Sequence, residues 1–197
     1  MGLRMRATTA SLALLAALGC ASEQKDRGTP ENAFARLAPC VDRGDARCVF
    51  RELDRDSRWS IETIHRTLAE MRDLVDGSYP AERRAGASVY GAWETAAAAA
   101  DGPGTFAAFC ARSDCVAEIA AGFGAVVSVR EAGEGRAEIT TTRGRSFAMA
   151  AADGAWGLAT WRAELSAEKI RLADKLEQVR IDAKAYDEQR RATGAPR

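Results

Sequence analysis

The spacing of hydrophobic and polar residues predicts helices in the first part of the chain, strands after residue 122 and one long helix at the end. Between residues 60 and 75, apolar residues recur every three or four positions, as they do along one face of an amphipathic helix. Beyond residue 122 the period is two, which is typical of strands with one buried face. The pattern predicts four strands, at residues 125–131, 136–142, 145–151 and 155–161.

Capping and turn residues mark the ends of the expected helices. A Thr-Pro-Glu sequence at residues 29–31 begins the first helix, and Gly44 ends it. Asp45 caps a second short helix, and a third runs from residue 60 to residue 76. The alanine-rich stretch 82–122 is expected to be helical in pieces, because Gly and Pro interrupt it.

Short glycine-containing turns between the predicted strands indicate an antiparallel meander. One face of this sheet is apolar, and we expect the first three helices to cover it. The residues of that face are Val127, Val129, Ile139, Thr141, Phe147, Met149, Trp156 and Leu158. The predicted fold class is therefore α+β, with N-terminal helices packed on a four-stranded, cone-like antiparallel meander and a long C-terminal helix after it.

The first nineteen residues have the pattern of an export signal. Two arginines precede an apolar stretch at residues 7–18, whose helix would rise only about 18 Å, short of the roughly 30 Å core of a bilayer. The stretch ends in Leu-Ala-Ala-Leu-Gly-Cys and resembles a bacterial lipobox, which implies a lipoprotein signal peptide at residues 1–19 and lipidation of Cys20. Ala17 stands where the lipobox usually has Leu, so simple cleavage and a plain secreted product is the alternative.

Residues 20–29 are polar and show no hydrophobic period, so they are expected to be a flexible tether between lipid and domain. Ala21 follows the cysteine where the best-known sorting rule would have an inner-membrane retention aspartate. The resemblance therefore implies a membrane partner reached through the lipid anchor, with the periplasmic face of the outer membrane favoured.

Four further cysteines, an even number, are typical of disulfides in a chain exported to an oxidising space. They are Cys40, Cys48, Cys110 and Cys115. Three pairings are open, and sequence proximity favours pairing the first two and the last two. The second of these pairs requires a break in any helix between its cysteines, which Ser113 and Asp114 can supply. A zinc site is the alternative, but the chain has no CxxC pair and a single histidine.

The composition excludes several classes of protein. The chain has 197 residues with 28 basic and 28 acidic side chains, so no basic surplus exists to neutralise the phosphates of a nucleic acid. The glycine-rich stretches at 102–104 and 122–124 lack the Lys and Ser/Thr of a phosphate loop, and no GxSxG motif occurs. No cofactor and no metal is therefore expected.

The order of predicted elements over residues 29–162 resembles the nuclear-transport-factor-2-like, or cystatin-like, cone. The likeness is carried by the segment DRGDARCVFREL at residues 42–53 and by the final hairpin DGAWGL at residues 153–158. It implies a cone-like domain at residues 30–162 with a helical insert at residues 81–122, similar to uncharacterised exported lipoproteins built on that cone. Enzymes of this fold, such as ketosteroid isomerases, place a carboxylate base inside the cone. The apolar sheet face here has no Asp, Glu or His on the same parity, so no catalytic residue is predicted.

Two further positions are candidates for local roles. Arg58 and Trp59 precede the third predicted helix, where a Trp beside an Arg lines a cavity mouth or, as the alternative, packs as a hydrophobic staple. His65 lies at the border of that helix's apolar face, where a local hydrogen bond is favoured over a role as general base.

Residues 163–197 are predicted to be an amphipathic helix and a tail. At 1.5 Å per residue, a helix over residues 163–192 reaches roughly 45 Å and is expected to project from the domain. Its apolar seam consists of Leu172, Leu176, Val179, Ala183 and Tyr186. This seam either docks on the chain's own domain or forms a coiled coil with an envelope protein or a second copy of the chain.

Together these features predict an outer-membrane-anchored periplasmic lipoprotein that acts as a non-catalytic binding or scaffolding module. The alternative is a protein that binds a small molecule, or transfers a proton, in the cavity of the cone.

Overall fold

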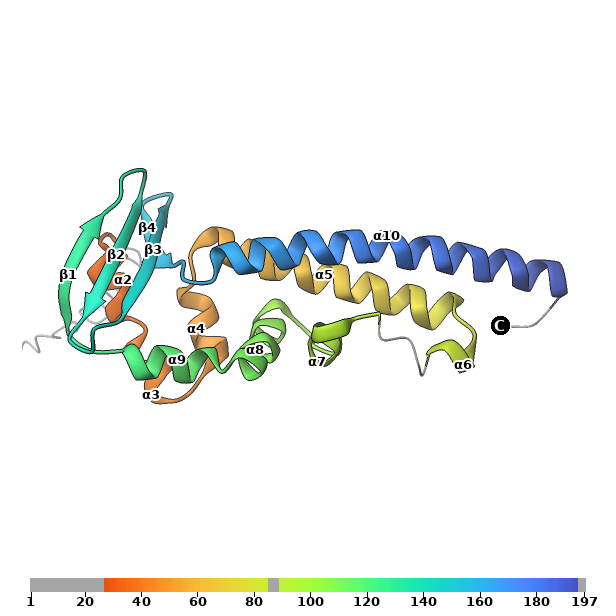
Figure 1. Ribbon diagram of the computed structural model, residues 1–197, viewed down its shortest axis with the longest axis horizontal. Coiled ribbons are helices and arrows are strands. Elements are labelled where there is room, and N and C mark those ends of the chain that lie inside the picture. Colours follow the sequence, from red (N-terminus) through yellow and green to blue (C-terminus); the bar gives the residue numbers. More distant parts are fainter. Residues whose placement is uncertain (1–26, 85–88, 195–197) are drawn as a thin grey trace, which may run out of the picture.

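The computed structural model describes residues 27–84 and 89–194, and its fold is α+β, as predicted (Figure 1). The signal peptide at residues 1–19, the lipidation site Cys20 and the tether up to residue 26 lie outside the described residues. Short helices and a four-stranded sheet form a base at one end of the molecule, and two long helices extend side by side away from it.

The first two predicted helices follow their predicted caps, with one additional break, whereas the third begins at Arg55 instead of residue 60 and is capped by Asp54. They are α2 (Pro30–Ala35), α3 (Ala38–Asp42), α4 (Ala46–Glu52) and α5 (Arg55–Ser78). Thr29 accepts a hydrogen bond from Asn32 N at the start of α2, and Asp45 accepts one from Cys48 N at the start of α4. The first predicted helix is divided in two because Pro39, which has no N–H group, cannot continue the helical ladder.

The predicted insert is helical in pieces: α6 (Ala81–Arg84), the 3₁₀ helix η1 (Gly91–Trp93), α7 (Glu94–Ala97), α8 (Gly102–Ser113) and α9 (Cys115–Gly122). Asp101 caps α8 by accepting a hydrogen bond from Gly104 N. Both α7 and α8 pack along α5, whereas α6 lies at the far end of that helix (Figure 1).

The sheet is the predicted antiparallel meander. Its strands are β1 (Val126–Glu131), β2 (Arg136–Thr141), β3 (Ser146–Ala152) and β4 (Ala155–Leu158), in that spatial order. Ile139 pairs with Phe147, and Met149 pairs with Leu158; all four are buried on the predicted inner face. The prediction for Val127 is wrong, because the register shifts between Val126 and Ser128 and leaves Val127 63% exposed.

One helix, not three, covers this sheet. Helix α2 contacts all four strands, and the ring of Phe34 lies 4.8 Å from that of Phe123 and 5.1 Å from that of Phe147. Helix α5 instead leaves the sheet and packs against α10 (Arg162–Thr193). The expectation that the first three helices cover the sheet is therefore wrong for the third. The apolar stripe of α5 packs against the seam of α10 instead.

Both predicted disulfides are formed. Cys40 and Cys48, with Cα atoms 5.2 Å apart, join α3 to α4, and Cys110 and Cys115, with Cα atoms 4.8 Å apart, join α8 to α9. The second pair is possible because Asp114 adopts a left-handed conformation, φ 53°, and ends α8 between the cysteines. Within residues 27–84 and 89–194, no cluster of His, Cys, Asp and Glu could hold a metal ion.

The two long helices begin at one joint on the edge of the sheet. The carboxylate of Asp54 accepts hydrogen bonds from the backbone of α5's first turn and pairs with Arg162 Nη2, 2.6 Å away, at the start of α10. The backbone N–H of Asp54 donates to the carbonyl of Leu158 in β4, at 3.0 Å. A Cβ atom at Gly157 would lie 2.6 Å from Asp54 N, so only glycine allows this close approach.

The seam of α10 lies inside the molecule. Leu172, Leu176, Val179 and Ala183 are buried, and Tyr186 is half-buried against Tyr79 of α5. Of the two alternatives for this seam, the structure shows docking on the chain's own helix, and the helix projects as predicted. In the part of the chain that is described, no helix is long and apolar enough to cross a membrane.

We expect Asp54→Ala to lower the free energy of unfolding by about 2–4 kcal/mol, because it removes a helix cap and a buried ion pair together. Asp54→Asn should lose less, since its amide oxygen still caps α5. The matched control is Asp56→Asn, which also removes a carboxylate near Arg162 but whose side chain is 65% exposed. Urea denaturation measures all three, and equal losses at positions 54 and 56 would contradict the joint.

Candidate functional site

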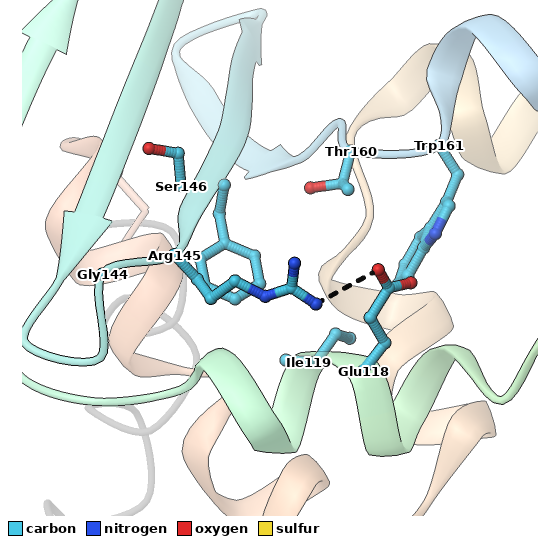
Figure 2. Close-up of a pocket in the computed structure, with 8 residues that line it drawn as sticks. Glu118, Ile119, Gly144, Arg145, Ser146, Thr160 and Trp161 are labelled. Carbon is cyan, nitrogen blue, oxygen red and sulfur yellow. Dashed lines mark hydrogen bonds and ion pairs between the residues drawn. The ribbon is translucent and has the colours of Figure 1, made fainter.

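A first hollow, of about 320 Å³, lies where α9, the turn between β2 and β3 and the start of α10 meet (Figure 2). Ile119, Phe147 and Trp161 supply its apolar lining. Glu118 and Arg145 face one another there, with 3.5 Å between Oε1 and Nη2. This carboxylate is half exposed and already paired, so it is poorly suited to abstract a proton from a bound molecule.

The buried carboxylates of the described residues have structural partners. Glu52 lies 3.1 Å from both Arg27 and Arg36, and Asp54 forms the joint with Arg162. The only histidine of the chain, His65, has its Nδ1 3.1 Å from the hydroxyl of the buried Thr105. These groups hold elements together: each is engaged by an arginine or a threonine of another element, which leaves it poorly suited to act as a general base.

The structure separates Arg58 from Trp59. Arg58 borders a small hollow of about 210 Å³, together with Asp54 and Trp156. Trp59 is 55% exposed on the outer side of α5, and Lys169 Nζ lies 4.1 Å from its ring centroid. Trp59 does not line the hollow that Arg58 borders. Because α5 begins at Arg55, Trp59 lies within the helix and not before it, where a hydrophobic staple would have to stand.

The strongest candidate for a binding site is a groove at the far end of the two long helices, which we call the tip groove. It has a volume of about 380 Å³ and lies between the end of α5, the start of α6 and the last turns of α10. Its lining consists of Ser78, Tyr79, Pro80, Ala81, Glu82, Arg84, Tyr186, Gln189, Arg190 and Thr193. The groove thus combines aromatic rings with side chains that donate hydrogen bonds.

The aromatic side of the tip groove is formed by two tyrosines. The ring centroids of Tyr79 and Tyr186 are 4.9 Å apart, with the planes tilted by 58°. The hydroxyl of Tyr79 donates to Asp182 Oδ2 at 3.4 Å. Burial and the neighbouring carboxylate of Asp182 raise the pKa of Tyr79 to about 12, so this phenol remains a neutral donor at any physiological pH.

The polar side of the groove is held in place by hydrogen bonds. Arg84 Nε donates to the carbonyl of Tyr79 at 2.8 Å, which fixes the turn after α5. Ser78 and Arg190 both donate to the carboxylate of Asp187. Tyr and Arg are the residue types that most often contribute the binding energy of protein interfaces, and here both types are presented on ordered helices.

The sequence pattern found part of this site. The pattern predicts Tyr186 as the last residue of the seam, but it ends the third helix at residue 76 and assigns no role to Tyr79 or Pro80 beyond it. The available signal was the second tyrosine, which follows the apolar stripe of α5 four residues after Val75. The register of α5 against α10, which brings the two rings together, is a tertiary feature that the periodicity does not determine.

Comparison of the chain with protein-family models, with curated proteins and with solved structures gave no match. Function is therefore argued from the residues and their geometry.

The raised pKa of Tyr79 gives a test of the groove. The phenol has a higher pKa in the folded chain than the ordinary 10.0, so its contribution to stability is complete below pH 10 and is lost as the pH rises toward 12. The absorbance of tyrosinate near 295 nm should show one of the three tyrosines ionising near pH 12, and Tyr79→Phe should remove that step.

Tyr90→Phe is the matched control and should leave the step near pH 12 in place. Far-ultraviolet circular dichroism, recorded in the same titration, identifies the pH range in which the chain is still folded. A late step that survives Tyr79→Phe would show that Asp182 and burial do not hold this phenol as the structure has it.

Proposed function

We propose that the protein is a lipid-anchored module on the periplasmic face of the outer membrane that binds another protein through the tip groove. The observation that carries this proposal is the position of the groove at the end of the α5–α10 pair opposite to the base. Arg27 belongs to the base, because its carbonyl accepts a hydrogen bond from Trp156 N and its side chain pairs with Glu52. The first described residue after Cys20 in the sequence thus lies in the base.

The distances suit such an arrangement. Cys20 and Arg27 are seven residues apart, a length of chain that spans at most about 25 Å. A lipid on Cys20 would therefore keep the base near the membrane surface. Helix α10 has 32 residues and is about 48 Å long, so it can hold the tip groove well beyond the headgroups.

A binding role is supported by the chemistry of the described residues. The interior carboxylates and the histidine are committed to contacts inside the protein, and Glu118 in the first hollow is paired with Arg145. A proton-transfer role, in contrast, needs a base within hydrogen-bond reach of a bound molecule. The proposal needs no cofactor.

The lining of the tip groove indicates the kind of partner. The ring of Tyr186, packed on the buried ring of Tyr79, and Pro80 offer a surface for apolar side chains. Arg84, Gln189 and Arg190 can donate hydrogen bonds to carboxylates or backbone carbonyls. A polypeptide segment that carries an acidic residue beside an apolar one satisfies both sides.

The anchor is tested by metabolic labelling with radioactive palmitate. We expect label in the wild-type protein and none in Cys20→Ser, because acyl transfer requires the thiol of that cysteine. Cys40→Ser is the control, since it removes a cysteine from the disulfide of the base and should leave the labelling intact. Label that persists in Cys20→Ser, or mature protein recovered free of membranes, would refute the anchor.

The tip groove is tested by photo-crosslinking in intact cells. A photoreactive amino acid at Gln189, inside the groove, is expected to give a discrete crosslinked product. The same amino acid at Arg143, an exposed residue in the turn between β2 and β3, should give none. Adding Arg84→Ala should weaken the product at least five-fold, because that guanidinium lines the groove.

Arg191→Ala is the matched control for Arg84→Ala, since Arg191 is exposed on α10 but does not line the groove. It should leave the product unchanged. Equal yields of crosslinked product from the probe at Gln189 and at Arg143 would contradict binding at the tip. So would a yield at Gln189 that Arg84→Ala leaves unchanged.

A further inference from the structure

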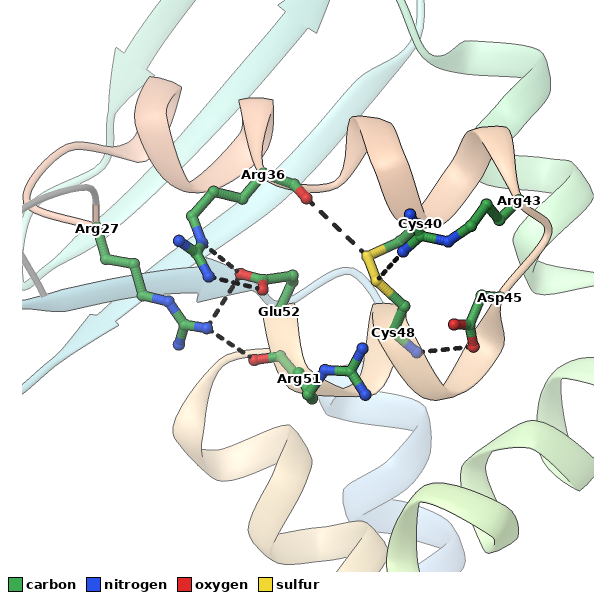
Figure 3. The surroundings of a disulfide bond; sticks show 8 residues. All are labelled: Arg27, Arg36, Cys40, Arg43, Asp45, Cys48, Arg51 and Glu52. Atoms are coloured by element: carbon green, nitrogen blue, oxygen red, sulfur yellow. Dashed lines mark hydrogen bonds and ion pairs between the residues drawn. A yellow bond between two sulfur atoms is a disulfide. The ribbon is translucent and has the colours of Figure 1, made fainter. Parts of the chain in front are cut away.

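We propose that a hollow in the base of the protein binds the phosphate group of an anionic membrane lipid. This inference rests on the proposed lipid anchor, which brings the base to the membrane. The hollow, which we call the arginine hollow, has a volume of about 340 Å³ and lies beside the Cys40–Cys48 disulfide (Figure 3). Its lining consists of Arg27, Arg36, Pro39, Cys40, Cys48, Arg51 and Glu52.

A buried carboxylate organises the arginines of this hollow. Figure 3 shows the guanidinium groups of Arg27 and Arg36 converging on Glu52. Arg27 Nη2 and Arg36 Nε each lie 3.1 Å from Glu52 Oε2, and Arg36 Nη2 lies 3.2 Å from Oε1. The side chain of Glu52 is only 8% exposed. The arginines are therefore held in defined positions before any ligand arrives, which lowers the entropy cost of binding.

The charge around the hollow remains positive after these pairs are counted. Three arginines line the hollow, Arg27, Arg36 and Arg51, and Glu52 is the one carboxylate among its lining residues. The carboxylate of Asp45 is engaged as the cap of α4. Arg51 is exposed, and no ion pair joins it to any residue of the described chain. The positive charge of Arg51 thus faces solvent at this place.

The N–H donors of Arg27 and Arg51 suit a phosphate oxyanion. Guanidinium groups present several N–H donors in one plane and bind phosphate oxygens in pairs. Arg27 uses a single nitrogen, Nη2, for both its contact with Glu52 and its contact with the carbonyl of Arg51. Its other N–H groups are left for a ligand, together with the guanidinium of Arg51.

The position of the hollow close to Cys20 in the sequence favours a lipid headgroup over free phosphate as the ligand. Arg27 follows Cys20 by only seven residues, so an acylated Cys20 holds the hollow within about 25 Å of a surface densely covered with lipid phosphates. Tethering of this kind raises the effective concentration of lipid headgroups far above that of phosphate in solution. Attraction between arginines and anionic headgroups near the surface adds to this effect.

The test uses the chain from residue 20 with Cys20→Ser, so that binding through the hollow is measured without the lipid. Its core and both disulfides lie within the described residues. We expect it to partition to vesicles of phosphatidylglycerol, and only weakly to vesicles of phosphatidylcholine. Arg51→Gln should lower the partition coefficient about five-fold, the loss expected for one arginine near an anionic surface.

Arg143→Gln is the matched control, because it removes one exposed arginine from the turn between β2 and β3. It should change the partition coefficient less than two-fold. Circular dichroism and urea denaturation check that both variants keep the fold of the parent chain. Equal partitioning of Arg51→Gln and the parent, or equal affinity for the two kinds of vesicle, would overturn the proposal.

Inorganic phosphate, added to the same vesicles, distinguishes the two sources. A lipid site should withstand millimolar phosphate at constant ionic strength. Displacement from the vesicles by micromolar phosphate would assign the hollow to a soluble ligand and overturn the lipid proposal. Because the chain used here has no acylated cysteine, this result is independent of palmitate labelling, and the two proposals can fail separately.

Discussion

Asp54 connects the last strand of the sheet to the first turns of both long helices. It caps α5 and pairs with Arg162 at the start of α10. The backbone of Asp54 lies so close to β4 that only a glycine fits at position 157. Because α5 and α10 leave this one point side by side, each buries its apolar stripe against the other instead of against the sheet. The elongated form of the molecule, and the separation of its two ends, follow from this joint.

The two ends differ in how they are stabilised. At the base, the Cys40–Cys48 disulfide and the pairs of Glu52 with Arg27 and Arg36 join short helices to one another. At the tip, stability comes from the contact of Tyr79 with Tyr186 and from hydrogen bonds across α5 and α10. The disulfide therefore restrains the base, whereas the tip is held by side-chain packing and hydrogen bonds alone.

Local patterns in the sequence predicted what local physics determines. The caps at Thr29 and Asp45, the four strands and the break between Cys110 and Cys115 depend on residues a few positions apart. The pattern did not predict which surface covers α5, because an apolar stripe does not specify its partner. It also missed the bulge that exposes Val127 and the tip groove, since both depend on register between separate elements. The arginine hollow joins residues from three segments, and no spacing along the chain marks it.

The packing of α10 also decides where a partner can bind. Five apolar side chains of α10 are buried, Leu165, Leu172, Leu176, Val179 and Ala183, and exposing them would cost on the order of 10 kcal/mol. A partner that used this seam as a coiled coil would first have to separate α10 from α5 and break the ion pair of Arg180 with Glu70. Two large apolar residues of α10, Ile170 and Ile181, are exposed. Single exposed apolar side chains of this kind do not form an interface. A partner that binds in the tip groove does not meet this cost, because the groove is accessible while α5 and α10 remain packed together.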